Sequence, residues 1–167
     1  TPPTPSPVLL ELVGVLVAGS RHDRVGTQLV RMRATEPLVH LVASGVSFRH
    51  PVFQDVVEIC WNLLERTVTT LRRGPPARSR SELLRRRREE SALVALGTLE
   101  ALDALTGLLE RLLLAGYRRS DKELRNEVLV VLTLLADRSR NRPLFAECGL
   151  LSLLLLYGTA AELDLPT

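Results

Sequence analysis

The chain repeats one local pattern three times, and this pattern constrains its fold more than any other feature. In each copy a short amphipathic helix runs into a tight turn, and a leucine-rich helix follows at once. The turns fall at positions 33, 97 and 149, with an apolar residue four positions before and five positions after each. These residues are Leu29, Leu93 and Phe145 before the turns, and Leu38, Leu102 and Leu154 after them. Such units cannot bury their apolar faces alone, so the repetition predicts stacked helices, an α-solenoid.

Composition favours helices packed on helices. Of the 167 residues, 46% are hydrophobic but only 4% are aromatic. Every apolar segment has helical spacing and none keeps a two-residue alternation, so we expect an all-α fold in a single domain. Helices are expected at 8–18, 25–32, 35–44, 52–68, 83–96, 99–115, 120–136, 141–147 and 150–156. Thr35, Ser81, Ser120 and Asn141 are expected to cap the helices that follow them.

The expected compartment is intracellular and cytoplasmic. No apolar run approaches the roughly 20 residues that span a bilayer, and the proline-rich segment 1–7 is typical of a linker rather than a signal peptide. We therefore expect no membrane association, and the chain looks like an excerpt from a longer protein. Cys60 and Cys148 are far apart in apolar helical segments, so both are expected to be reduced core thiols.

Segment 127–156 resembles an armadillo repeat. It has a long third helix (128–136), a short polar loop, a short first helix opened by Asn141, a turn at Gly149 and a leucine-rich second helix (150–156). Segments 89–105 and 28–64 show the pattern less clearly. The resemblance implies a leftover third helix at 8–18, a repeat at 24–67, a basic insertion at 68–88, a second repeat at 89–137 and a partial repeat at 140–167.

The array is irregular, because its turns are separated by 64 and 52 residues against about 42 in regular armadillo arrays. Arginine-rich, irregular arrays with long insertions resemble the large armadillo proteins of cilia and flagella. The residue pattern alone leaves a HEAT-type solenoid or an irregular helical bundle open. The nuclear-import branch of the family pairs a tryptophan with an asparagine four residues later. In this chain the residue four positions after Trp61 is Glu65. Trp61 is therefore expected in the core rather than in a peptide-binding groove.

A basic segment interrupts the helical pattern after residue 71. Between Arg72 and Arg88 there are eight arginines and one glutamate, a local excess of +7 in a chain of net charge +3. Gly74-Pro75-Pro76 predicts a loop over 72–81 that projects into solvent. The candidate partner-binding residues are Arg72, Arg73, Arg78, Arg80, Arg85, Arg86, Arg87 and Arg88.

The chemistry of this segment favours acidic protein surfaces as partners. Nucleic-acid binding would use aromatic side chains for stacking, and the segment has none. A nucleic-acid-binding helical-repeat protein is the alternative function, and a solvated, disordered insertion is the alternative to any binding.

No residue pattern predicts catalysis, a metal or a cofactor. His22, His40 and His50 lie in separate segments without ligand spacing, and no phosphate-binding or nucleophile motif is present. The resemblance thus implies a non-enzymatic scaffold or protein-interaction module within a larger complex. It points to the ciliary or flagellar axoneme, with tubulin or axonemal proteins as acidic partners.

Overall fold

The computed structural model describes residues 6–44, 50–73, 79–89, 91–115 and 121–159, and all regular structure in these ranges is helical. The helices are α1 (Pro7–Ser20), α2 (Asp23–Arg31), α3 (Thr35–Ala43), α4 (Val52–Arg73), α5 (Arg80–Glu89), α6 (Ser91–Ala95), α7 (Leu99–Leu114), α8 (Lys122–Ala136), α9 (Arg142–Glu147) and α10 (Leu150–Thr159). A short 3₁₀ helix, η2 (Ser139–Asn141), precedes α9. The all-α prediction is confirmed for these residues, and none of the helices is long and apolar enough to cross a membrane.

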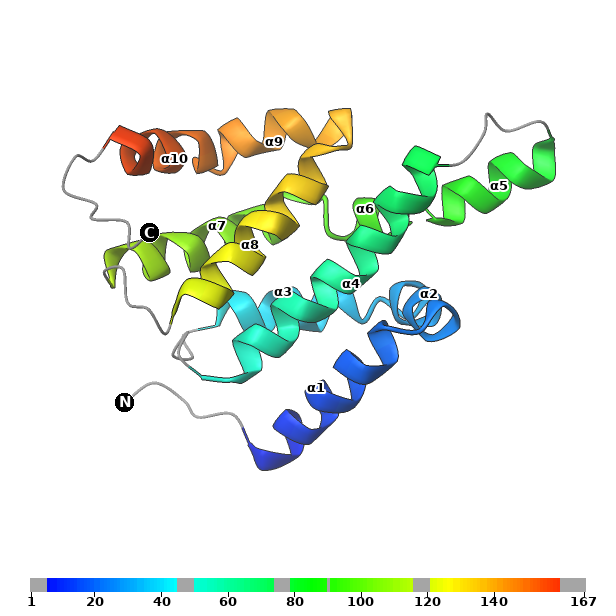
Figure 1. Cartoon of the computed structure of the whole chain (residues 1–167), viewed down its shortest axis with the longest axis horizontal. Helices are drawn as coiled ribbons and strands as arrows, with labels where there is room; N and C mark the ends of the chain where they lie inside the picture. Colours follow the sequence, from blue (N-terminus) through cyan, green and yellow to red (C-terminus); the bar gives the residue numbers. More distant parts are fainter. Residues whose placement is uncertain (1–5, 45–49, 74–78, 90, 116–120, 160–167) are drawn as a thin grey trace.

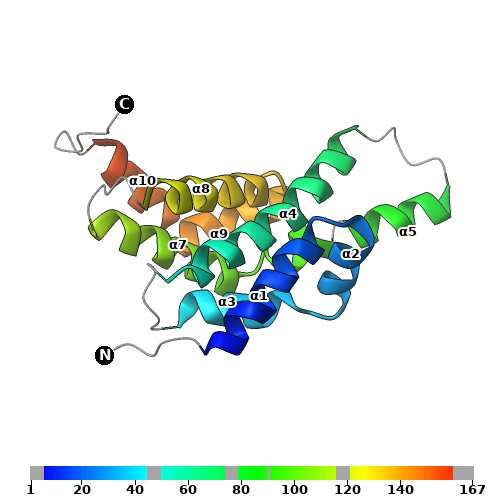
Figure 2. The same cartoon turned by 60° about the horizontal axis from the view of Figure 1, so that its bottom comes forward.

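The long helices form two layers. In one layer α4 packs between α1 and α8, and in the other α3 packs against α7. Figure 1 shows α1, α4 and α8 running in a similar direction, with α3 and α7 behind them. Figure 2 shows α1 in front of α4, with α8 on the far side of α4. Within the first layer the order along the chain is therefore also an order in space, because α1 packs on α4 and α4 packs on α8.

The core lies between these layers, and α4 is its central element. Val52, Val56, Ile59 and Leu63 are almost completely buried, as their helical spacing predicts. Trp61 is only half-buried and packs against the edge of this core. The expectation of a core tryptophan was therefore too strong, because the long helix turns this position toward the rim of the cluster.

Two of the three expected turn positions adopt the left-handed conformation. Gly149 has a φ of 76° and Arg33 a φ of 56°, although an arginine replaces glycine there. The equivalent position, Gly97, does not adopt this conformation and instead lies close to the Asn141 side chain. Leu154 is 38% exposed, whereas its counterparts Leu38 and Leu102 are buried, because no described helix covers that side of α10.

Helix ends differ from the sequence expectations where capping was inferred from residue type alone. Thr35 is the first residue of α3 and is buried without capping it. Ser120 lies outside the described residues, and Asp121 precedes α8 without a side-chain cap. Asn141 precedes α9, but its side chain does not cap that helix either. Side chains from neighbouring helices satisfy several helix ends instead.

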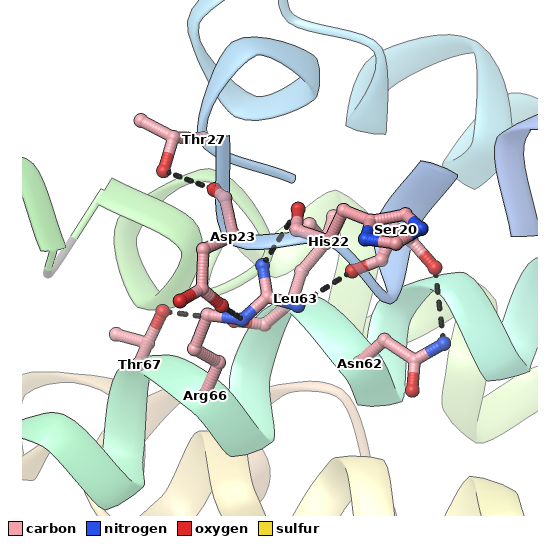
Figure 3. Close-up of polar contacts among 8 residues, drawn as sticks. All are labelled: Ser20, His22, Asp23, Thr27, Asn62, Leu63, Arg66 and Thr67. Carbon is pink, nitrogen blue, oxygen red and sulfur yellow. Dashed lines mark hydrogen bonds and ion pairs between the residues drawn. The ribbon is translucent and has the colours of Figure 1, made fainter. Parts of the chain in front are cut away.

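Arginines supply several of these contacts. In Figure 3, Arg66 of α4 donates through Nη2 to the Ser20 carbonyl (2.8 Å) and through Nη1 to the His22 carbonyl (3.3 Å). Its Nε lies 2.7 Å from Asp23 Oδ1, and Asn62 Nδ2 donates to Ser20 Oγ at 3.0 Å. The final carbonyls of a helix have no partner within it and carry partial negative charge. Arg66 therefore fixes the angle between α1 and α2 from the side of α4.

The same contact recurs one helix pair further on. Arg111 of α7 donates through Nη2 to the Val42 carbonyl at the end of α3 (2.9 Å), and its guanidinium lies over the Phe53 ring at 5.9 Å from the centroid. Burial lowers the pKa of Arg111. Arg66 and Arg111 thus hold neighbouring helices together, so these arginines have a structural role.

Candidate interaction surface

The structure divides the candidate arginines into two groups. Arg72 and Arg73 form the last turn of α4 rather than a loop, because the helix continues to the residue before Gly74. Arg80 is exposed and begins α5, so the predicted loop over 72–81 is wrong at both ends. Ser79, not Ser81, accepts a hydrogen bond from the Glu82 backbone (3.2 Å) at the start of this helix.

The remaining candidates are described only in part. Arg78 lies outside the described residues, and Arg85–Arg88 lie on α5, where the structure describes the backbone but not these side chains. The expected helix over 83–96 is divided, with α5 ending at Glu89 and α6 beginning at Ser91. The structure thus brings Arg72 to a defined surface and leaves the α5 arginines as sequence candidates.

Arg72 is held by Asp137, which follows α8. Its Nη2 lies 2.6 Å from Asp137 Oδ1, and its Nε lies 3.2 Å from Asp137 Oδ2. This two-pronged geometry is characteristic of strong arginine–carboxylate pairs, and the hydrogen bonds to Asp137 raise the pKa of Arg72. The pair joins the end of α4 to the end of α8.

A groove with a volume of about 900 Å³ opens beside this pair, and we call it the arginine groove. It lies where the ends of α4 and α8 meet α6. Its lining residues are Leu71, Arg72, Leu93, Val94, Asp137, Arg138, Ser139 and Arg140. The groove therefore has an apolar part from α4 and α6 and a basic rim from the segment after α8.

Asn141 fixes the walls of the arginine groove. It is buried, and its Nδ2 donates to the Leu135 carbonyl at 3.0 Å and more weakly to the Leu93 carbonyl at 3.4 Å. Its Oδ1 accepts a hydrogen bond from Arg138 Nη1 (3.2 Å). A Cβ at Gly97 would lie 2.5 Å from Asn141 Nδ2 and 2.3 Å from the Leu93 carbonyl oxygen. Gly97 is thus required for this close approach.

Sequence reasoning missed the two arginines that complete the rim, Arg138 and Arg140. They lie in a segment that was interpreted only as a polar loop between helices. Arg140 is exposed, and neither arginine forms an ion pair with a carboxylate among the described residues. No local signal marked them, because the parts of the groove that come from α4 and α6 are far from them in sequence.

An acidic face lies along α4 and α8. Burial, and to a lesser extent the charge of Glu58, raises the pKa of Asp55. Burial also raises the pKa of Glu127, and Glu58 and Glu123 add to this effect. Glu58 itself accepts hydrogen bonds from Arg21. Carboxylates are thus crowded on a face that sequence analysis did not single out.

The described residues contain no group of three or more metal-ligating side chains. Cys60 and Cys148 are both free thiols, as expected. Burial raises the pKa of the Cys60 thiol to about 12. Cys148 is only half-buried, so its placement in the core was wrong; its Sγ lies 3.4 Å from Thr106 Oγ1.

The described ranges combine packed helix pairs, two inter-helix turns with a residue in the left-handed conformation and a surface groove. This combination is typical of helical-repeat proteins. Comparison with known proteins gives the particular family. The family model described as "Cilia- and flagella-associated protein 69, ARM repeat" matches residues 81–165, about half of the chain. The chain belongs to this armadillo-repeat family, which confirms the resemblance inferred from the repeats.

Individual relatives agree with the family match. The chain is 32% identical over 105 residues to cilia- and flagella-associated protein 69 of Callithrix jacchus, and 31% identical over the same length to the Homo sapiens protein. These alignments cover 63% of this chain but only 9% of each relative. The family is an armadillo-repeat family and not a known enzyme family. No solved structure matches the chain.

Proposed function

We propose that this chain is a non-enzymatic protein-interaction module, an α-solenoid of armadillo-like repeats in a large assembly of the cilium or flagellum. The observation that carries the proposal is the family match over residues 81–165. The names of the relatives associate them with cilia and flagella, and the same compartment is proposed for this chain. Its division into a repeat at 24–67, a second at 89–137 and a partial third at 140–167 is part of the proposal.

The packing of the helices supports a solenoid. Successive long helices α1, α4 and α8 lie side by side, and α3 packs on α7 in the second layer. Apolar side chains remain exposed at both sides of the stack, including Val8 and Leu12 of α1 and Leu151 of α10. A repeat array has this property because each unit contacts only its neighbours along the array.

The arginines of the basic segment supply the contact to a partner with acidic surfaces, such as an axonemal protein or a tubulin tail. Arg72 and Arg80 have exposed side chains, and Arg73, Arg78 and Arg85–Arg88 continue the same run of positive charge. Attraction between such groups and carboxylates acts over about one Debye length and weakens as salt rises.

Localisation tests the first part of this proposal. The chain is expressed with a fluorescent tag in ciliated cells, and its signal is compared with an axonemal marker and with the tag alone. Enrichment along the cilium is expected. A distribution indistinguishable from that of the tag alone would contradict the assignment.

Charge removal tests the second part. Arg85→Ser/Arg86→Ser should weaken binding of a fluorescent polyglutamate peptide at low salt without changing the melting temperature. Arg24→Ser/Arg31→Ser, which removes the same charge from exposed positions on α2, is the matched control. If both double variants bind the peptide equally well, the proposal that the α5 arginines contact the partner is wrong.

A further inference from the structure

We propose that the arginine groove binds an acidic, extended peptide segment of a partner protein, with one apolar side chain of that peptide seated against Leu71 and Val94. This inference rests on the proposed function, and it assigns the contact to a defined site that includes Arg138 and Arg140. The site lies across the ends of α4 and α8, and its lining contains two residues that no sequence pattern identified.

The shape of the groove suits a chain segment rather than a flat surface. Its lining comes from three separate parts of the chain, and it has a volume of about 900 Å³. Val94 is 46% exposed at the surface of α6, and Leu71 is half-buried beside it. An apolar side chain that covers these two residues would remove apolar surface from water, which favours binding.

The charge of the groove selects an acidic partner. Among the lining residues that the structure describes, three are arginines and one, Asp137, is acidic. Asp137 already pairs with Arg72, so the charges of Arg138 and Arg140 are not offset by a carboxylate among the described residues. A peptide carboxylate can accept two parallel hydrogen bonds from the planar guanidinium group of either arginine.

The groove is also fixed before any partner arrives. Arg138 donates to Asn141, which in turn bonds to the end of α8 and to α6. Arg72 is oriented by Asp137. Since these side chains are already ordered, binding costs less conformational entropy than it would for free arginines.

Nucleic acid fits the same groove less well. Single-stranded nucleic acid is bound through base stacking on aromatic side chains as well as through charge, and the part of the lining that the structure describes has no aromatic residue. The apolar part of the groove, formed by Leu71 and Val94, would find no apolar group on a sugar–phosphate chain to pack against. An acidic peptide with one apolar residue uses both features of the groove.

The test measures fluorescence anisotropy of a labelled Glu- and Asp-rich peptide with one central leucine, at low and at physiological salt. Arg140→Ser should weaken binding about two- to five-fold at low salt. Val94→Ser should weaken binding of this peptide but not of the version whose leucine is serine. Arg24→Ser on α2 is the matched charge control, and melting curves of all variants verify folding.

The outcomes separate the two proposals. If Arg140→Ser and Val94→Ser bind like wild type while Arg85→Ser/Arg86→Ser binds weakly, the proposal that the groove binds the peptide is overturned. The proposal that the basic segment binds an acidic partner is then retained. If the wild-type chain does not bind the peptide at either salt, both are overturned. If an oligothymidine displaces the peptide at lower concentration than unlabelled peptide does, the acidic-peptide assignment is overturned in favour of nucleic acid.

Discussion

Replacement of Gly97 by alanine tests the packing that shapes the arginine groove. The new Cβ would lie 2.3 Å from the Leu93 carbonyl oxygen and within 2.6 Å of both polar atoms of the Asn141 side chain. Real Cβ atoms do not approach other atoms so closely, so either the backbone before the turn or Asn141 must move. Asn141 is buried and bonds to two backbone carbonyls, and any movement would break these hydrogen bonds.

The magnitude follows from two separate costs. Overpacking of a filled site costs about 1–3 kcal/mol, and a buried polar group without a partner costs about 1–3 kcal/mol. Gly97→Ala should therefore lower the free energy of unfolding by roughly 2–6 kcal/mol. In a domain of this size the corresponding fall in melting temperature is roughly 4–24 °C.

Gly107→Ala is the matched control, because its Cβ would meet nothing within 4 Å on helix α7. The same substitution there should stabilise the protein by about 0.5–1 kcal/mol through helix propensity. Urea unfolding followed by far-ultraviolet circular dichroism measures both variants. If Gly97→Ala unfolds at the same urea concentration as wild type, the close approach of Gly97 and Asn141 is wrong.

Four further outcomes are expected. Leu132→Ala should cost about 2–5 kcal/mol, measured by urea unfolding, because Leu132 is buried; Trp61→Ala should cost less than a fully buried tryptophan would. Cys148 should react with a thiol reagent at pH 8 while Cys60 stays protected, since burial raises the Cys60 pKa to about 12; equal rates in native protein would contradict this. Glu127 has a raised folded pKa, so its charge lowers stability as pH rises through that pKa. Glu127→Gln should therefore melt higher at neutral pH, with the difference lost in acid; an unchanged difference across this range would refute the effect.

The helices could be predicted from sequence because their apolar residues follow one period. Val52, Val56, Ile59 and Leu63 marked the buried side of α4 correctly. The turn at position 33 was also found, although an arginine occupies it, because flanking apolar residues kept the register. The spacing of apolar residues within one segment is enough to predict which side of that helix faces the core, and it needs no knowledge of the neighbouring helices.

The site was only half predictable because its residues meet through tertiary contacts. Arg72 was assigned to a loop on account of the glycine and prolines after it, but its pairing with Asp137 places it on an ordered helix end. Arg140 was missed because nothing near it in sequence shows which residues face it. Asn141 was identified by type as a cap, while its amide in fact bonds to helices α6 and α8.

The bonds from Arg66 and Arg111 to the ends of neighbouring helices have a consequence for how the array comes apart. An isolated helix frays from its ends, since its last carbonyls have no partner within it. Here the last carbonyl of α1 accepts from α4, and a carbonyl in the last turn of α3 accepts from α7. Fraying of one helix therefore requires a side chain of another to be released. Slowly exchanging amides should extend to these helix ends, and the helices should be lost as linked groups rather than one at a time.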